Sequence, residues 1–205
     1  MEWLLVPVAY VIGSVQPGLI VVKLTMHVDV RTLGSGRTGM TNVLRSAGKR
    51  AAAVVFAADA GKGVALTLAA RLLSDDAIVH AAVGTAVIVG HVWPVFAGFR
   101  GGRGIATGVA ASLGLDPWTA LAGVAAFVPV LAAFRYVSLA SIVSVAAAVA
   151  AFAVRTALFD APAAYVGYAI VGATVIIAMH RDNIGRLRRG EERRLGVVPT
   201  EVVDR

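Results

Sequence analysis

The stretch that decides the fold is residues 90–107, GHVWPVFAGFRGGRGIAT. It leaves one apolar run after Pro94, makes a turn of four glycines with Arg100 and Arg103, and enters the next apolar run at Ile105. Such a turn at the start of a helix presents free N–H groups and the positive end of the helix dipole to an anion. Between two apolar runs it indicates an anion site at a membrane surface. A short loop kept in the cytosol by its arginines is the alternative.

The composition is that of an integral membrane protein. The chain has 205 residues, of which 58% are hydrophobic and 15% charged, and its mean hydropathy is +0.79. About 20 apolar residues are needed to span a bilayer as a helix. Most of the apolar runs come near that length; they cover residues 4–22, 51–73, 77–97, 105–134, 136–154 and 161–179. We therefore predict an all-α polytopic membrane protein that forms a single domain over residues 1–205.

Charge placement predicts the topology. Residues 23–50, 100–103, 135 and 181–205 hold 16 of the 19 Lys and Arg residues. Because positive loops stay in the cytosol, we expect the N-terminus outside, the C-terminus inside and an odd number of spans. Seven spans fit best, with five as the alternative. Residues 105–115 are too short to cross alone, and such a segment is tolerated where it packs on protein.

The first cytosolic segment, residues 27–50, follows a span that contains GSVQPG at 13–18, where Pro17 should kink the helix. The segment carries GSGRTGMTNVLR at 34–45. Its glycines and Ser35 predict a tight turn rich in donors, and Thr41 or Asn42 is expected to cap a helix that begins at Val43. Arg45 on that helix would face the headgroups. A solvated basic loop would explain the charges but not the glycines.

The second and third spans carry ionisable groups. Asp59 and Lys62 are three residues apart on one helical face, and charges within a span are costly unless they are paired or face the bundle interior or water. They form either a buried pair that fixes helix packing or a group that holds a neighbouring cation. We expect His80 to be structural, whereas His91 leads directly into the glycine turn.

The third cytosolic segment, residues 180–196, contains HRDNIGRLRRGEERR at 180–194. His180 and Asn183 recur at helical spacing and can share a face at the membrane edge. A basic tail that only anchors to anionic lipid would not require this pair. No spacing of His, Asp and Glu suggests a metal site, so none is predicted. Segment 98–107 is the remaining cytosolic segment.

These motifs together resemble the bacterial acyl-phosphate:glycerol-3-phosphate acyltransferase family over nearly the whole chain. The family patterns are approximately G-S-G-N-x-G-A-T-N-x-x-R, G-H-x-x-P-x-F-x-x-F-x-G-G-K-G-x-A-T and H-x-x-N-I-x-R-L-x-x-G-x-E. This sequence has GSGRTGMTNVLR, GHVWPVFAGFRGGRGIAT and HRDNIGRLRRGEE in the same order, with the family-like DAGKG at 59–63.

The resemblance implies a seven-helix enzyme of the bacterial plasma (inner) membrane with its active site on the cytosolic face. It would transfer a fatty acyl group from acyl phosphate to the 1-hydroxyl of glycerol 3-phosphate, the first acylation of phospholipid synthesis. Carried over by position, the expected catalytic residues are Ser35, Arg45, His180 and Asn183. The expected phosphate-binding residues are Gly101, Gly102, Arg103, Gly104, Thr107 and Lys62. The expected supporting residues are Gly34, Gly36, Thr41, Asn42, Asp59, His91 and Glu192, the last as a partner of nearby arginines.

The chemistry fits these residue types. Acyl phosphate is already activated, so the step needs no cofactor, no nucleophilic side chain and no metal. The protein must orient the attacking hydroxyl and stabilise two phosphates and an oxyanion. Either His180 or a phosphate oxygen of the donor accepts the proton. The expected partners are the two substrates and membrane lipid, with no nucleic acid and no obligate protein partner.

The sequence departs from the family pattern at several positions. Arg37 stands where the family has Asn, Met40 where it has Ala, and Arg103 where it has Lys, while GSVQPG replaces G-S-I-P-F-G. Arg and Lys differ in shape at a tight phosphate site. A diverged paralogue with another substrate or little activity is therefore an alternative. An anion transporter should show internal repeats, which this sequence does not, and a non-catalytic scaffold would not need three such motifs.

Overall fold

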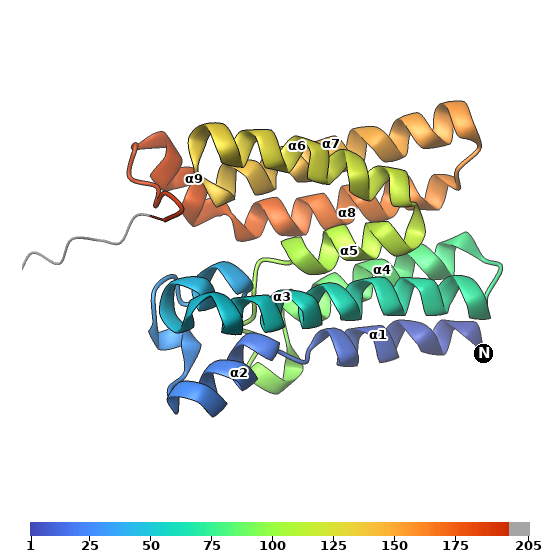
Figure 1. The fold of residues 1–205 in the computed structure, drawn as a ribbon. Helices are drawn as coiled ribbons and strands as arrows, with labels where there is room; N and C mark the ends of the chain where they lie inside the picture. Colours follow the sequence, from blue (N-terminus) through green and yellow to red (C-terminus); the bar gives the residue numbers. More distant parts are fainter. Residues whose placement is uncertain (197–205) are drawn as a thin grey trace, which may run out of the picture.

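The computed structural model describes residues 1–196, and every regular element in that part of the chain is helical. The elements are the short 3₁₀ helices η1 (Glu2–Leu4), η2 (Val30–Thr32) and η3 (Val95–Ala97), and the α-helices α1 (Leu5–Gly13), α2 (Pro17–Met26), α3 (Met40–Leu73), α4 (Ala77–Val92), α5 (Ile105–Leu115), α6 (Pro117–Phe134), α7 (Val137–Phe159), α8 (Ala163–Met179) and α9 (Arg181–Arg188). Helix α6 packs on α7, α7 on α8 and α8 on α4, while α3 and α4 both pack on the short α5 (Figure 1).

The helix lengths confirm a multi-pass membrane architecture. Within the described residues, five segments are long and apolar enough to cross a membrane: Glu2–Met26, Met40–Leu73, Ala77–Ala97, Pro117–Phe134 and Val137–Phe159. The pair α8 and α9 adds a sixth if it counts as one span bent by 59°. Helix α5 has 11 residues, which confirms that this segment is too short to cross alone. It packs instead against α3, α4 and α6.

The first span is broken, as Pro17 indicated. Helix α1 ends at Gly13, and α2 begins at Pro17, in the first position of the new helix. Proline suits that position because its missing N–H would have no helical partner there. The bend is therefore a gap between two helices, residues 14–16, rather than a kink within one.

The start of α3 corrects one expectation. The helix begins at Met40 after Gly39, not at Val43, and no side chain caps it. Thr41 and Asn42 therefore lie inside its first turn, and the Asn42 side chain forms hydrogen bonds with the preceding loop. Helix α3 bends at Gly48, whose φ of 82° is one that glycine adopts easily.

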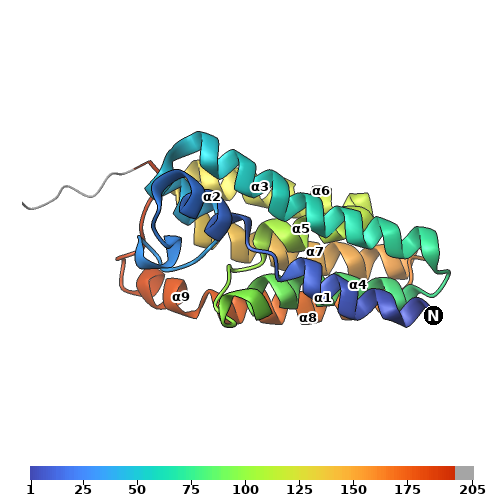
Figure 2. The ribbon, with the colours of Figure 1, turned by 90° about the horizontal axis from the view of Figure 1, so that it is seen from below.

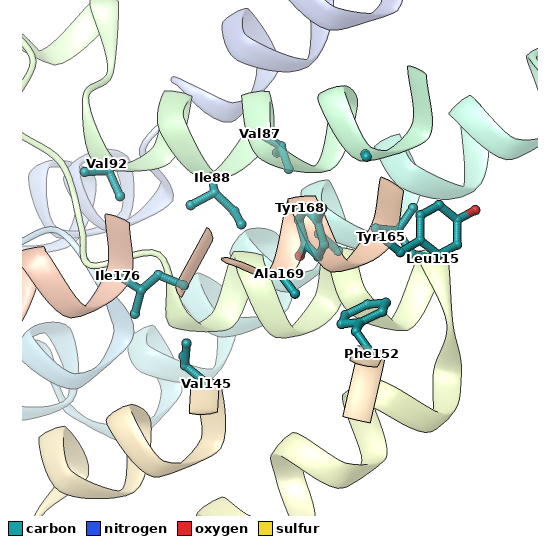
Figure 3. Packing of buried hydrophobic residues seen from close by; sticks show 12 residues of the cluster. Val87, Ile88, Val92, Leu115, Val145, Phe152, Tyr165, Tyr168, Ala169 and Ile176 are labelled. Carbon is teal, nitrogen blue, oxygen red and sulfur yellow. The ribbon is translucent and has the colours of Figure 1, made fainter. Parts of the chain in front are cut away.

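The core between α4, α5, α7 and α8 holds α5 in place (Figure 3). Phe152 is fully buried, and the rings of Tyr165 and Tyr168 meet it edge-on, with centroids 6.3 and 5.9 Å away. The Tyr168 hydroxyl donates to the Gly108 carbonyl at 2.8 Å. The labelled members of this core are Val87, Ile88, Val92, Leu115, Val145, Phe152, Tyr165, Tyr168, Ala169 and Ile176. This packing fixes the beginning of α5 beside α8.

The polar motifs gather at one end of the bundle. The 27–39 loop and α9 lie at the end opposite the N-terminus, and the 93–104 loop approaches them from the middle of the molecule (Figures 1 and 2). His80 lies away from this end, where its ring contacts the Tyr165 hydroxyl at 3.0 Å and the Ser74 carbonyl at 2.8 Å. His80 is structural, as expected.

Candidate active site

The glycine turn is held by its own backbone. The N–H of Gly101 donates to the Val92 carbonyl and the N–H of Gly102 to the His91 carbonyl, each at 3.2 Å. A Cβ at Gly102 would overlap the His91 ring, so only glycine lets the turn lie this close. The expectation that these two N–H groups are free for an anion was wrong, because the end of α4 uses them.

The free donors lie one step further along the chain. Gly104, with φ of 86°, precedes α5, and the N–H groups of the first turn of α5 have no helical partners. The positive end of the helix dipole adds to them. The part of the turn whose donors are free is therefore the stretch from Arg103 to Thr107, at the N-terminus of α5.

Two buried polar atoms at this helix start, Arg103 Nε and Thr107 Oγ1, have no hydrogen-bond partner among residues 1–196. The same holds for Asn183 Oδ1 on α9. Burial, with the charges of Arg37 and Arg186, lowers the pKa of Arg103 to about 10, so the guanidinium stays charged at neutral pH. A buried group that lacks its partner costs about 1–3 kcal/mol. A phosphate bound at the start of α5 would satisfy the two donors on Arg103 and Thr107.

His180 lies between α8 and α9 and is only 3% exposed. Its Nδ1 is 2.8 Å from the Ile176 carbonyl, which can only accept, so Nδ1 carries the hydrogen. Burial lowers the pKa of His180 to about 4, and the charges of Arg103 and Arg37 act in the same direction. The ring is therefore neutral at physiological pH, with Nε2 as a hydrogen-bond acceptor.

Glu192 holds α9 in position. Its carboxylate accepts from Asn183 Nδ2 at 2.7 Å, from Ser138 Oγ at 2.9 Å and from Arg186 Nε at 2.8 Å. Ser138 belongs to α7, so this one side chain ties the third motif to the bundle. The arginine partner expected for Glu192 is Arg186.

Asn42 organises the first motif. Its Oδ1 accepts from the Ser35 N–H at 2.8 Å, and its Nδ2 lies 2.9–3.1 Å from the carbonyl oxygens of Val30, Leu33 and Arg37. The loop passes through Gly34 and Gly36, both with positive φ. The half-buried Ser35 is thereby fixed within the 27–39 loop, which lies at the same end of the bundle as α9.

The two remaining residues of this motif lie on α3. Thr41 is half-buried in the first turn of the helix, whereas Arg45 is exposed. The Arg45 guanidinium reaches towards the third motif, 3.5 Å from the Arg193 carbonyl. Arg45 therefore lies at the edge of the site rather than at its centre.

Lys62 is engaged elsewhere. Its ammonium lies 2.9 Å from Asp59 Oδ1 and donates to the carbonyls of Gly13 and Val15 at 3.0 and 2.8 Å. His91 Nδ1 lies 3.1 Å from Lys62 Nζ and 3.2 Å from Asp59 Oδ1. The three donors of the ammonium are thus used within the protein, which argues against a phosphate ligand and favours the buried pair that fixes helix packing.

Sequence reasoning missed Gln16 and Thr38. Gln16, in the gap between α1 and α2, donates to the His91 carbonyl at 3.2 Å and accepts from the Thr38 hydroxyl at 2.6 Å. The available signal is a polar residue within GSVQPG, a stretch from which only a bend was predicted. Its partners lie 75 and 22 residues away, so the sequence did not indicate them.

An apolar crevice lies beside the first two turns of α5. Its walls come from four helices, α4, α5, α7 and α8; they include Ile88, Gly108, Val145, Phe152, Gly172 and Ile176. Gly108 is one turn below Gly104, so the crevice begins next to the start of α5. A lipophilic substituent on a bound anion would find apolar surface there.

Comparison with known proteins shows the family of the chain. The glycerol-3-phosphate acyltransferase family model matches residues 3–190. Glycerol-3-phosphate acyltransferases of Rubrobacter xylanophilus and Geobacter sulfurreducens are 45% and 39% identical to this chain, over 96% and 94% of its length and 96% and 97% of theirs.

Two crystal structures of PlsY (YgiH), an integral membrane glycerol 3-phosphate acyltransferase, also match. The glycerol 3-phosphate form has a TM-score of 0.88 and 38% identity, covering 95% of this chain and 96% of that one. The lysophosphatidic acid form has a TM-score of 0.85 and 36% identity, covering 95% of each chain. The likeness extends to the whole helical arrangement described above.

Proposed function

Because this chain belongs to the glycerol-3-phosphate acyltransferase family, an integral membrane enzyme family, we propose that it acylates the 1-hydroxyl of glycerol 3-phosphate with acyl phosphate as the donor. The products are 1-acylglycerol 3-phosphate and inorganic phosphate. The observation that carries this proposal is the pair of buried atoms without partners among the described residues at the start of α5, on Arg103 and Thr107, together with the Asn183 amide oxygen on α9. Two are donors suited to a phosphate and one is an acceptor suited to a hydroxyl.

The charges at this end suit two phosphate-bearing substrates. The first turn of α5 and Arg103 bind one phosphate, and Arg37 and Arg45 compensate the charge of the other. Positive groups fixed in a partly dry site stabilise developing negative charge without reorganising. This distribution supports a reaction between two anions, which would repel each other without such groups.

In the proposed step, the O1 oxygen of the acceptor attacks the acyl carbon. A new ester bond forms, and the bond from the acyl carbon to the phosphate oxygen breaks. Asn183 Oδ1 and His180 Nε2 orient the hydroxyl by accepting its hydrogen bond, and Ser35 positions the carbonyl. With a pKa of about 4, His180 is a weak base, so the proton passes to an oxygen of the departing phosphate. The step itself calls for neither nucleotide nor metal.

Apolar side chains that the acyl chain of the donor could contact lie beside this centre. The crevice lined by Gly108, Val145, Phe152 and Ile176 is apolar and begins one turn from the phosphate site. Burial of each methylene contributes about 0.8 kcal/mol. Chain binding there would anchor the donor while its phosphate lies at the start of α5.

For the topology, we propose seven membrane crossings, of which α5 forms one only together with the glycine turn that precedes it. The N-terminus is outside, and the active site and C-terminus face the cytosol of a bacterial plasma membrane. The arginine-rich end that carries α9 supports this orientation. We infer one domain over residues 1–205, of which 197–205 lie outside the described residues.

The decisive experiment measures phosphate release by purified protein given palmitoyl phosphate with and without glycerol 3-phosphate, and identifies the lipid product. Release that depends on glycerol 3-phosphate and yields lysophosphatidic acid supports the proposal. Acyl-CoA and the acyl thioester of acyl carrier protein serve as alternative donors. Formation of lysophosphatidic acid from either of these, but not from palmitoyl phosphate, would contradict the donor assignment. Activity with another acceptor but not with glycerol 3-phosphate would indicate a diverged paralogue, the alternative suggested by Arg37 and Met40.

A further inference from the structure

Gln16 occupies an unusual place for a polar side chain. It lies in the gap between α1 and α2, is 4% exposed, and its carbonyl receives the first hydrogen bonds of α2. The family pattern has proline at this position, whereas here the proline has moved to residue 17 and opens α2. The shift leaves position 16 free to carry a side chain that points into the protein.

One side of the Gln16 amide reaches the glycine turn. Its Nε2 donates to the His91 carbonyl at 3.2 Å, and the same oxygen accepts the N–H of Gly102 at 3.2 Å. Gly102 is bonded covalently to Arg103, which carries an unpartnered Nε among the described residues. Gln16 and the residue that precedes the proposed anion-binding stretch therefore donate to the same oxygen, the His91 carbonyl.

The other side of the amide reaches the first motif. The Thr38 hydroxyl, on a residue 1% exposed, donates to Gln16 Oε1 at 2.6 Å. Thr38 directly follows Arg37, whose backbone carbonyl is held by Asn42. A Cβ at Gly18 would overlap the Thr38 carbonyl, so the start of α2 also fixes the Thr38 backbone. Gln16 thus joins two loops that Asn42 and α4 otherwise hold separately.

We propose that Gln16 is a positioning residue that fixes the first-motif loop relative to the glycine turn and so sets the affinity of the active site for the phosphate group of its substrates. Gln16 touches no substrate and acts through Thr38 and His91. The proposal rests on the proposed function only in taking the start of α5 as a phosphate site. It also accounts for a polar, buried residue where the family pattern has proline.

The test is a double-mutant cycle between Gln16→Met and Thr38→Val, which keep side-chain size but remove the hydrogen bond. Inorganic phosphate, the common product, is the probe, and its affinity is measured by protection of the detergent-solubilised protein against thermal unfolding. Each single variant should weaken phosphate binding about tenfold, which is the loss of one buried hydrogen bond. The double variant should be no weaker than the poorer single one. In turnover, KM should rise by a similar factor while kcat changes less than threefold.

Two further variants separate positioning from stability. Thr38→Ser keeps the hydroxyl and should restore wild-type affinity. Ser14→Ala removes a fully buried hydroxyl of the same gap that donates only to the Tyr10 carbonyl, one turn back. It should lower the unfolding temperature without changing phosphate affinity.

The results that would overturn the proposal are distinct from those that would overturn the reaction. Additive effects of Gln16→Met and Thr38→Val, unchanged phosphate affinity in both, or absence of phosphate binding by the wild-type protein would each end it. Failure of turnover with intact phosphate binding would instead count against the proposed donor or acceptor and leave the coupling measurement valid. If Gln16→Met does not fold, the contrast between Thr38→Val and Thr38→Ser decides.

Discussion

Asn183 donates its amide Nδ2 to Glu192 Oε1 at 2.7 Å, and this one hydrogen bond decides which way its amide faces. The opposite atom, Oδ1, is buried without a partner among the described residues. A carboxylate can only accept, so Glu192 forces Asn183 to present an acceptor to the site. Glu192 therefore controls a residue of the proposed active centre although its own carboxylate is occupied by protein groups.

Replacement of Glu192 by Gln should lower kcat/KM about 10- to 100-fold, since the amide would no longer accept from both Asn183 and Arg186. Glu191→Gln is the matched control. Glu191 forms an exposed pair with Arg189 at 2.7 Å, and exposed pairs contribute little. Phosphate-release kinetics measures both variants. Equal losses in the two would show that the orientation of Asn183 does not depend on Glu192.

Arg103→Ala should raise the KM of a phosphate substrate about 100-fold, because it removes a buried, charged donor at the start of α5. Arg103→Lys keeps the charge but not the planar fork of the guanidinium. Its KM should lie between those of the wild-type protein and Arg103→Ala. Arg100→Ala serves as the control, since Arg100 is an exposed arginine of the same turn. A loss at Arg100 as large as at Arg103 would mean that only net charge matters.

Lys62→Met should destabilise the protein by about 3 kcal/mol or more, because it leaves Asp59 without its ammonium partner inside the bundle. Phosphate affinity of the folded fraction should stay within about threefold of wild type, since the ammonium is fully used by protein atoms. Thermal unfolding with and without phosphate measures both quantities. A selective loss of phosphate binding would restore Lys62 to the list of phosphate ligands.

His180 should stay neutral between pH 5.5 and 8. Its pKa is lowered to about 4 by burial, whereas an unfolded histidine titrates near pH ~6.5. Between the two pKa values, from about 4 to ~6.5, the unfolded chain therefore binds more protons than the folded one. The contribution of His180 to stability is complete above pH ~6.5 and is lost as the pH falls towards 4. Nuclear magnetic resonance of ¹³C-labelled histidines, assigned with His180→Asn, should show no titration above pH 5.5. A midpoint near 6.5 would contradict the buried, neutral ring.

Gly102→Ala should destabilise the protein by about 1–3 kcal/mol, because the new methyl group would overlap the His91 ring and force the turn away from α4. Gly167→Ala is the control on α8, where an added Cβ meets nothing within 4 Å and alanine favours the helix by roughly 0.5–1 kcal/mol. Unfolding in detergent measures the difference. Similar stabilities for the two variants would show that the close contact with His91 is not required.

By itself the sequence determined the helical membrane class, the short α5, the break at Pro17, the gathering of positive charge in three segments and the family. These follow from apolar run length, proline geometry and side-chain charge, which are properties of single stretches of chain. Only the tertiary structure decided which donors are free. It showed that the N–H groups of Gly101 and Gly102 donate to the end of α4, and that the Lys62 ammonium donates to carbonyl oxygens at and beside the α1–α2 gap. It also showed that Gln16 joins two motifs through hydrogen bonds. A hydrogen-bond partner depends on which distant backbone atom arrives within about 3 Å, and no local pattern carries that information.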